Sequence, residues 1–232
     1  RSLVGSEMCI RDSFHVTQIK RSEGRTAVAS AAYRAGEKLH NLWDGETHDY
    51  TRKGGVILSE IMLPEHTPER FFDRSTLWNE VEQVEKNYNA QLAYSFDMAL
   101  QNEFSLEENI ELAREFVQKY FVSDGMIADL AVHKPDRDEG GISNPHFHVL
   151  VPIRPLSADG TWGAKQRREY HLDENGNRIK KENGGWKFDA VPTTNWGRPE
   201  TLDMWREAWA DMVNDKFKEK GLDCRIDHRS YV

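Results

Sequence analysis

The fold is decided by one stretch of sequence, Asn144-Pro145-His146-Phe147-His148-Val149-Leu150-Val151. Side chains along a β-strand alternate between its two faces, so His146 and His148 project from one face and Phe147 from the other. Upstream, His133 ends an apolar run that begins at Ile127. The intervening segment, residues 134–145, is rich in Asp and Gly and is predicted to be a loop joining two antiparallel strands.

This pairing places His133 across the ladder from the other two histidines. Three neutral imidazoles that converge in this way can hold one divalent ion and leave positions open for a substrate. A lone His-x-His pair also occurs by chance on a strand, as a surface or core pair. The histidines alone therefore leave both interpretations open.

The composition predicts one globular domain. The chain has 232 residues, of which 38% are hydrophobic and 30% charged, enough for a real core. Its only cysteines, Cys9 and Cys224, lack neighbours at metal-ligand spacing, which indicates a reducing compartment without a disulfide framework. No apolar run approaches the roughly 20 residues of a membrane span, so no membrane insertion is expected.

The net charge of −8 speaks against nucleic acid as the partner at first sight. The acidic residues, however, concentrate in two predicted helices, within residues 80–85 and 103–115. We expect these acids to face solvent on the far side of the molecule. The net charge therefore does not decide whether the partner is a nucleic acid.

Local patterns predict the order of the elements. Helix signals include alanines within residues 25–40, Thr67 as an N-cap for a helix reaching about Tyr88, and a capping box of Ser105 with Glu108. The predicted strands are residues 14–20, 56–62, 92–100 and those bearing the histidines, and the predicted helices are residues 25–40, 67–88, 105–122 and 199–220. Residues 41–55 are expected to be a polar loop.

Two residues stand out within these elements. Asp97 lies mid-strand between Phe96 and Met98, where a carboxylate is costly unless it meets solvent at a sheet edge or accepts a hydrogen bond. Tyr33 lies on the alanine-rich helix, where a tyrosine is most often a packing residue with a hydrated hydroxyl. The sequence pattern alone assigns neither a role.

After Arg154, hairpin signals at Asp159-Gly160, Asn175-Gly176 and Gly184-Gly185 predict a hairpin-rich insertion. Trp162, Tyr170 and Trp186 alternate there with the cationic segments 165–168 and 178–181. Cations interleaved with aromatic rings suit single-stranded nucleic acid, which needs phosphate neutralisation and base stacking. Such hairpins are also commonly just solvated, so this signal is weak by itself.

Residues 1–13 fit no structural period and lack the apolar core of a signal peptide. The string resembles translated sequencing-adaptor read-through. We therefore take it as extraneous and assign residues 14–232 to the functional domain.

An ordered set of motifs resembles the MobA/MobL mobilisation relaxases, a branch of the HUH endonucleases. The resemblance covers residues 14–231, and the matching motifs are Gly24-Arg25-Thr26-Ala27, Ala31-Ala32-Tyr33-Arg34-Ala35-Gly36, His48-Asp49-Tyr50-Thr51-Arg52-Lys53, Leu77-Trp78-Asn79, Gly125-Met126-Ile127-Ala128-Asp129, Asn144-Pro145-His146-Phe147-His148, Trp162-Gly163-Ala164-Lys165 and Arg225-Ile226-Asp227-His228-Arg229-Ser230-Tyr231. It implies an α+β fold with a central antiparallel sheet of about five strands and helices on one face. The metal site would lie on the central strands, beside a helix-borne tyrosine.

The resemblance also implies a reaction. A divalent ion (Mg²⁺ or Mn²⁺, with Zn²⁺ possible on softness grounds) would be bound by His133, His146 and His148. Tyr33 would attack one DNA strand at a specific site and form a 5′-phosphotyrosine link, the step that starts conjugative plasmid mobilisation. We expect Asp97 beside the histidines, where it would orient a metal-bound imidazole or act as general base. The expected DNA-binding residues are Arg25, Arg34, Lys53, Lys165, Arg167 and Arg168.

The implied partners are single-stranded DNA at an origin of transfer, accessory mobilisation proteins and a coupling protein, in the bacterial cytoplasm. The relatives usually continue into further domains, so the chain is expected to be truncated at its C-terminus. It departs from the family pattern at Tyr94-Ser95, where a basic-acidic pair is usual, and at Gln101, where proline is usual.

Two alternatives from other classes remain. A three-histidine zinc hydrolase would use the same ligands with water as nucleophile and would not need Tyr33. A non-catalytic nucleic-acid-binding module would use the basic hairpins and keep the histidines as structural residues.

Overall fold

A computed structural model describes residues 14–134 and 144–228; the predicted adaptor segment 1–13, most of the predicted loop (135–143) and the terminal 229–232 lie outside the described residues. Five antiparallel strands form the central sheet in the order β1-β5-β7-β6-β4. They are β1 (Phe14–Lys20), β4 (Val56–Met62), β5 (Gln91–Ala99), β6 (Ala128–His133) and β7 (His146–Pro152). The predicted α+β fold with a five-stranded antiparallel sheet is confirmed.

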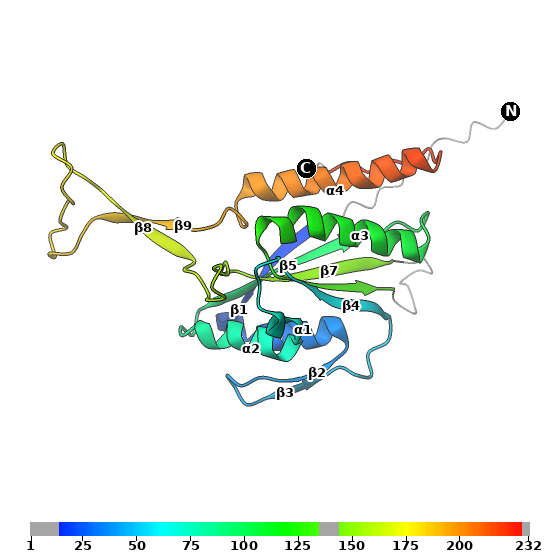
Figure 1. Cartoon of the computed structure of the whole chain (residues 1–232), viewed down its shortest axis with the longest axis horizontal. Helices are drawn as coiled ribbons and strands as arrows, with labels where there is room; N and C mark the ends of the chain where they lie inside the picture. Colours follow the sequence, from blue (N-terminus) through cyan, green and yellow to red (C-terminus); the bar gives the residue numbers. More distant parts are fainter. Residues whose placement is uncertain (1–13, 135–143, 229–232) are drawn as a thin grey trace.

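Helices cover both faces of this sheet (Figure 1). One face packs against α1 (Ala27–Ala35) and α2 (Arg74–Val84), and the other against α3 (Leu106–Tyr120) and α4 (Pro199–Glu219). The expectation of helices on one face only is therefore wrong. The physical reason is that the central strands are apolar on both sides: Phe147 and Val149 face one helix pair, whereas Leu150 faces the other, so each face needs a cover.

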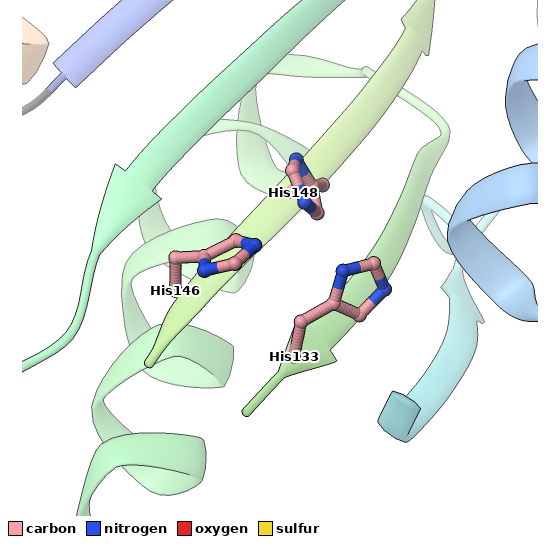
Figure 2. A group of neighbouring side chains, drawn as sticks. All are labelled: His133, His146 and His148. Carbon is pink, nitrogen blue, oxygen red and sulfur yellow. The ribbon is translucent and has the colours of Figure 1, made fainter. Parts of the chain in front are cut away.

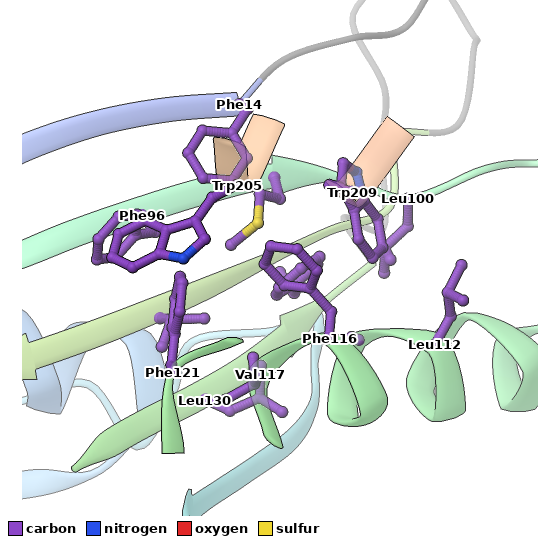
Figure 3. Close-up of a cluster of buried hydrophobic side chains, with 14 of the residues drawn as sticks. Phe14, Phe96, Leu100, Leu112, Phe116, Val117, Phe121, Leu130, Trp205 and Trp209 are labelled. Carbon is purple, nitrogen blue, oxygen red and sulfur yellow. The ribbon is translucent and has the colours of Figure 1, made fainter. Parts of the chain in front are cut away.

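An aromatic cluster fills the space between the sheet and the α3–α4 pair (Figure 3). Phe96 from β5 meets Phe121 with ring centroids 4.8 Å apart, and Phe121 meets Trp205 of α4 at the same separation. Both pairs are tilted, with interplanar angles of 47° and 60°, and their centroid separations lie within the range of favourable aromatic pairs. The cluster holds β5 and β7 rigidly from the face opposite the histidines.

Helix α1 ends earlier than the predicted boundary at residue 40. Gly36 takes a left-handed conformation with φ of +67°, which favours glycine and stops the helix after Ala35. The chain then forms a small hairpin of β2 (Lys38–His40), which was expected to be the end of the helix, and β3 (Thr47–Asp49), which lies in the expected polar loop. The early stop places the residues that follow Tyr33 beside the end of the sheet.

Helix α2 begins later than predicted. Asp73, and not Thr67, is its N-cap, because the Asp73 side chain accepts a hydrogen bond from the Thr76 N–H at 2.7 Å. The preceding residues form the short 3₁₀ helix η2 (Glu69–Phe72); two others, η1 (Arg21–Glu23) and η3 (Val122–Asp124), follow β1 and α3. Ser105 caps α3 with the predicted capping box.

Glu82 of α2 does not face solvent, contrary to the expectation for the acids of residues 80–85. The Glu82 side chain is fully buried, pairs with Arg21 at 2.7 Å and accepts a hydrogen bond from the Ala27 N–H at 2.6 Å. Since a buried carboxylate requires such partners, Glu82 is a structural link between α2 and the first turn of α1. Thr26 caps the same turn by accepting from the Ala29 N–H at 2.9 Å. The helix that carries Tyr33 is thus fixed at its N-terminus.

The predicted hairpin-rich insertion is confirmed. Strands β8 (Gln166–Tyr170) and β9 (Phe188–Pro192) pair antiparallel and extend away from the sheet; residues 166–192 are called the β8–β9 arm (Figure 1). Gly160, Gly176 and Gly184 have positive φ angles at the predicted turns. Within the described residues, no helix has the length and apolar character needed to cross a bilayer.

Candidate metal and tyrosine site

Three histidine rings converge at one end of the two central strands (Figure 2). His133 pairs directly with His146 in the β6–β7 ladder, and His148 lies two residues further along β7 on the same face. One nitrogen from each ring lies within 4.8 Å of those of the other two. The predicted convergence is therefore present, on the face of the sheet that α1 covers.

Each ring has its tautomer set by an oxygen acceptor. The His133 Nε2–H donates to the Arg34 carbonyl at 2.7 Å, the His146 Nδ1–H to the Asn144 carbonyl at 2.8 Å, and the His148 Nδ1–H to the Asp97 carboxylate. An imidazole that donates from one nitrogen keeps a lone pair on the other. The lone pairs therefore lie on His133 Nδ1, His146 Nε2 and His148 Nε2.

Burial keeps the inner rings neutral. It lowers the pKa of His133 from 6.5 to about 3, and it also lowers the pKa of His148, although Asp97 acts in the opposite direction. Neutral imidazoles with oriented lone pairs, each held by an oxygen acceptor, are the donor set of a histidine-bound divalent ion. The residues present thus fit a metal ion.

Asp97 lies opposite His148 in the β5–β7 ladder. Because β5 lies between β1 and β7, the alternative of a carboxylate at the sheet edge is wrong. Burial alone would raise the pKa of Asp97, but the hydrogen bond from His148, together with the Arg34 guanidinium 4.0 Å away, holds it below its ordinary value. The carboxylate therefore stays ionised and holds the His148 ring.

Tyr33 projects from the last turn of α1 and is 49% exposed, so it is not buried in the core. The Tyr50 ring meets it edge-on, with centroids 5.2 Å apart, and the Lys53 ammonium lies 3.6 Å from its ring centroid. The next residue, Arg34, supplies the carbonyl that accepts from His133. The tyrosine helix and the histidine cluster are therefore in direct contact.

The predicted DNA-binding residues divide between two places. Arg34 and Lys53 lie at the histidine site, and half-buried Arg25 donates to the Gln18 carbonyl at 3.2 Å before the start of α1. The structure does not bring the others to this site: Lys165, Arg167 and Arg168 lie at the base of the β8–β9 arm, which follows the far end of β7. Of these, Lys165 pairs with buried Glu85 at 2.9 Å, whereas Arg167 and Arg168 are exposed.

The sequence analysis missed a buried ionic network beside α1. Asp129 on β6 accepts hydrogen bonds from the Arg74 guanidinium and, at 2.8 Å, from the Trp78 indole N–H. Arg74 also pairs with Glu37, two residues after α1. Asp129 lies in an apolar strand just as Asp97 does, so the cost of an unpaired carboxylate could have identified it too.

The metal-free protein should lose stability in mild acid. Because the folded state lowers the pKa of His133 to about 3, the unfolded chain binds this proton between pH 6.5 and 3 and the folded chain does not. The contribution of His133 to the free energy of unfolding is therefore complete above pH 6.5. Below pH 6.5 this contribution falls by about 1.4 kcal/mol for each pH unit. Thermal unfolding in EDTA should therefore give a lower Tm at pH 5 than at pH 7, with a smaller difference in His133→Gln. An equal difference in wild type and variant would contradict this.

Comparisons with known proteins identify relatives of this chain. The chain is 34% identical over 229 residues to the conjugal transfer protein TraA of Agrobacterium fabrum, covering 94% of this chain and 20% of TraA. It is 31% identical over 218 residues to the mobilization protein MobL of Acidithiobacillus ferridurans, covering 92% of this chain and 56% of MobL. The chain thus spans a fifth of TraA and little more than half of MobL.

A solved structure described as "Molecular Basis of Vancomycin Resistance Transfer in Staphylococcus aureus" has the same fold. It superimposes with a TM-score of 0.76 at 30% identity and covers 95% of this chain and 99% of its own. The model of the MobA/MobL family matches residues 25–232, which include all of the proposed site. The chain belongs to the MobA/MobL family.

Proposed function

We propose that this chain is the nicking domain of a conjugative mobilisation relaxase. The observation that supports this most directly is the contact between two parts of the site. Three imidazoles with set tautomers lie against the C-terminal end of the helix that presents an exposed tyrosine. A metal site for polarising a phosphate and a nucleophile for attacking it are therefore built as one unit.

His133, His146 and His148 would hold the divalent ion, Mg²⁺ or Mn²⁺, with Zn²⁺ favoured by the nitrogen ligands on softness grounds. When bound, the ion supplies positive charge that withdraws electron density from the non-bridging oxygens of the scissile phosphate. Because the three imidazole ligands are neutral, the bound ion keeps its full positive charge.

The nucleophile in this proposal is Tyr33. Its phenolic oxygen forms a bond to phosphorus while the bond from phosphorus to the 3′ oxygen breaks, which leaves a 5′-phosphotyrosine and a free 3′-hydroxyl. The proton lost by the phenol balances the one gained by the 3′ oxygen. Because one phosphoester replaces another, a later strand transfer can reverse the step.

The DNA strand would contact exposed cations of the β8–β9 arm and the half-buried Arg25. Arg167 and Arg168 are exposed on the β8–β9 arm, where the Arg168 guanidinium lies 4.8 Å from the Phe188 ring centroid and Arg178 lies 3.8 Å from that of Tyr170. Such cation and ring pairs neutralise phosphates and stack bases. Arg25 would contact the DNA near α1. Arg34 and Lys165 are largely buried and would act mainly through the electrostatic attraction of their charges for the phosphates. The proposed partners are single-stranded DNA at an origin of transfer, accessory mobilisation proteins and a coupling protein, in the bacterial cytoplasm.

Asp97→Asn should weaken Mn²⁺ binding about 10- to 100-fold, because a neutral amide holds the His148 ring less firmly than a carboxylate does. The nicking rate at subsaturating Mn²⁺ should fall in parallel. Calorimetric titration with Mn²⁺ and the adduct assay below measure the two effects. Unchanged affinity together with an unchanged rate would show that the contact between Asp97 and His148 has no functional role.

The proposed function is tested by incubating the protein with a pool of labelled single-stranded oligonucleotides and Mn²⁺. A covalent protein–DNA adduct that survives a denaturing gel and disappears with EDTA is expected. Phosphodiester hydrolysis that persists in Tyr33→Phe without an adduct would favour the three-histidine hydrolase. DNA binding without any cleavage, unchanged by EDTA, would favour the non-catalytic module.

A further inference from the structure

The C-terminal end of α1 leaves backbone carbonyls without partners in the helix itself. The Ala32 carbonyl accepts hydrogen bonds from the backbone N–H groups of Gly36 and Glu37. The next two carbonyls have side-chain donors from elsewhere: Tyr33 O accepts from the Lys53 ammonium at 2.9 Å, and Arg34 O accepts from His133. The end of the tyrosine helix is therefore capped by a lysine and by a candidate metal ligand.

Lys53 contacts Tyr33 twice. Its ammonium donates to the Tyr33 carbonyl and also lies 3.6 Å from the centroid of the Tyr33 ring, within cation–π range. Tyr50, from the same turn, packs edge-on against that ring, and the Lys53 N–H donates to the Tyr50 carbonyl at 2.9 Å. One turn thus holds both the backbone and the side chain of Tyr33.

The same segment also contacts the histidine strand. The Gly55 carbonyl accepts from the Lys134 N–H at 2.8 Å, directly after His133. Lys53 is half-buried, and in the described part of the chain no carboxylate pairs with it. Its burial and the nearby Arg34 charge lower its pKa to about 8, so placing a cation here carries a cost. The contacts with the helix end and the ring offset that cost.

We propose that Lys53 is a positioning residue for Tyr33, which holds the phenol ring in one orientation toward the histidine cluster. The proposal rests on the proposed function of this site and deepens it. A half-exposed tyrosine without these contacts has several side-chain rotamers available. Holding one of them keeps the nucleophile in the geometry of attack, whereas a misplacement of about 1 Å can cost on the order of 100-fold in rate. The competing role for Lys53 is that of a simple phosphate contact.

The chain offers a matched control in Arg52. This exposed residue lies in the same turn and carries the same charge, and the structure records no contact between it and Tyr33 within the described residues. Lys53→Met removes the ammonium but keeps an alkyl chain of similar length. Lys53→Arg keeps a cation that can reach the ring. Thermal unfolding of each variant establishes that it is folded.

The rate of adduct formation is measured in a single turnover at saturating DNA. Lys53→Met should slow it by about 100-fold, Lys53→Arg should recover most of the loss, and Arg52→Met should leave the rate near that of the wild type. Equal rates in Lys53→Met and Arg52→Met at saturating DNA would overturn the proposal. A rate loss in Lys53→Met that appears only at subsaturating DNA would make Lys53 a phosphate contact.

A second measurement needs neither DNA nor activity. In protein labelled with ¹³C in the tyrosine rings, the Tyr33 signal is assigned by its absence in Tyr33→Phe. This signal should shift in Lys53→Met and stay in place in Arg52→Met. An unchanged Tyr33 signal in Lys53→Met would overturn the proposal. If the wild type forms no adduct, the proposed function fails, and this spectrum still decides whether Lys53 holds the Tyr33 ring.

Discussion

His146→Ala should abolish metal-dependent DNA cleavage while leaving the domain folded. His146 supplies one of the three ligand nitrogens, so its loss leaves too few protein ligands to hold the ion tightly. Of the three histidines, His146 also makes the smallest contribution to holding the fold together. Within the described residues, its one hydrogen bond is to the Asn144 carbonyl nearby in sequence, whereas His133 is 5% exposed and holds the end of α1.

Three measurements check this outcome. Calorimetric titration should show the loss of tight Mn²⁺ binding, the adduct assay should show no product, and the thermal unfolding of the metal-free protein should change little. The matched control is His40→Ala, which removes an exposed histidine on β2 outside the cluster. Cleavage that persists in His146→Ala at trace or at saturating metal would refute the metal assignment.

Tyr33→Phe should eliminate the covalent adduct and keep both Mn²⁺ and DNA binding. The substitution removes the attacking oxygen but preserves the ring that packs against Tyr50 and Lys53. The phosphotyrosine forms only from the phenolic oxygen at the attacking position, so the expected loss is complete if Tyr33 is that residue. If the variant still binds Mn²⁺ and DNA, the loss of the covalent adduct does not result from misfolding.

Peptide mapping of the trapped wild-type adduct identifies the attacking residue independently. The DNA should be found on the segment of residues 25–38, and Tyr50→Phe should still form an adduct. Tyr50 is the natural competitor, because its ring lies beside that of Tyr33. An adduct on Tyr50 or Tyr231 would refute the choice of Tyr33.

The acidity of the chain is compatible with a DNA partner because of where the acids lie. On the α3–α4 side, Glu108, Glu111, Glu115 and Asp215 line a cavity of about 320 Å³. These helices cover the face of the sheet opposite the histidines, as was expected for the acids of residues 103–115. Two acids of residues 80–85 instead pair internally: Glu82 of α2 with Arg21, and Glu85, which follows α2, with Arg154 and Lys165. The net charge of −8 thus does not describe the surface around Tyr33.

The sequence by itself determined the features that depend on short-range periodicity. The two-residue repeat of a strand placed His146 and His148 on one face, and the glycine-containing hairpin signals located the turns of the arm. The cost of a carboxylate between Phe96 and Met98 left two interpretations for Asp97, a place at a sheet edge or a hydrogen-bond partner. These inferences needed only neighbouring residues, because strand geometry repeats over two residues.

Only the tertiary structure decided how distant segments meet. The contact of the Arg34 carbonyl with His133 joins residues 99 apart in the chain, and the contact of Lys53 with Tyr33 joins residues 20 apart. The cover of helices on both faces likewise followed from packing and not from the strand pattern. Local propensity cannot encode such contacts, because the free energy that selects them comes from burying surfaces and satisfying polar groups contributed by several elements at once.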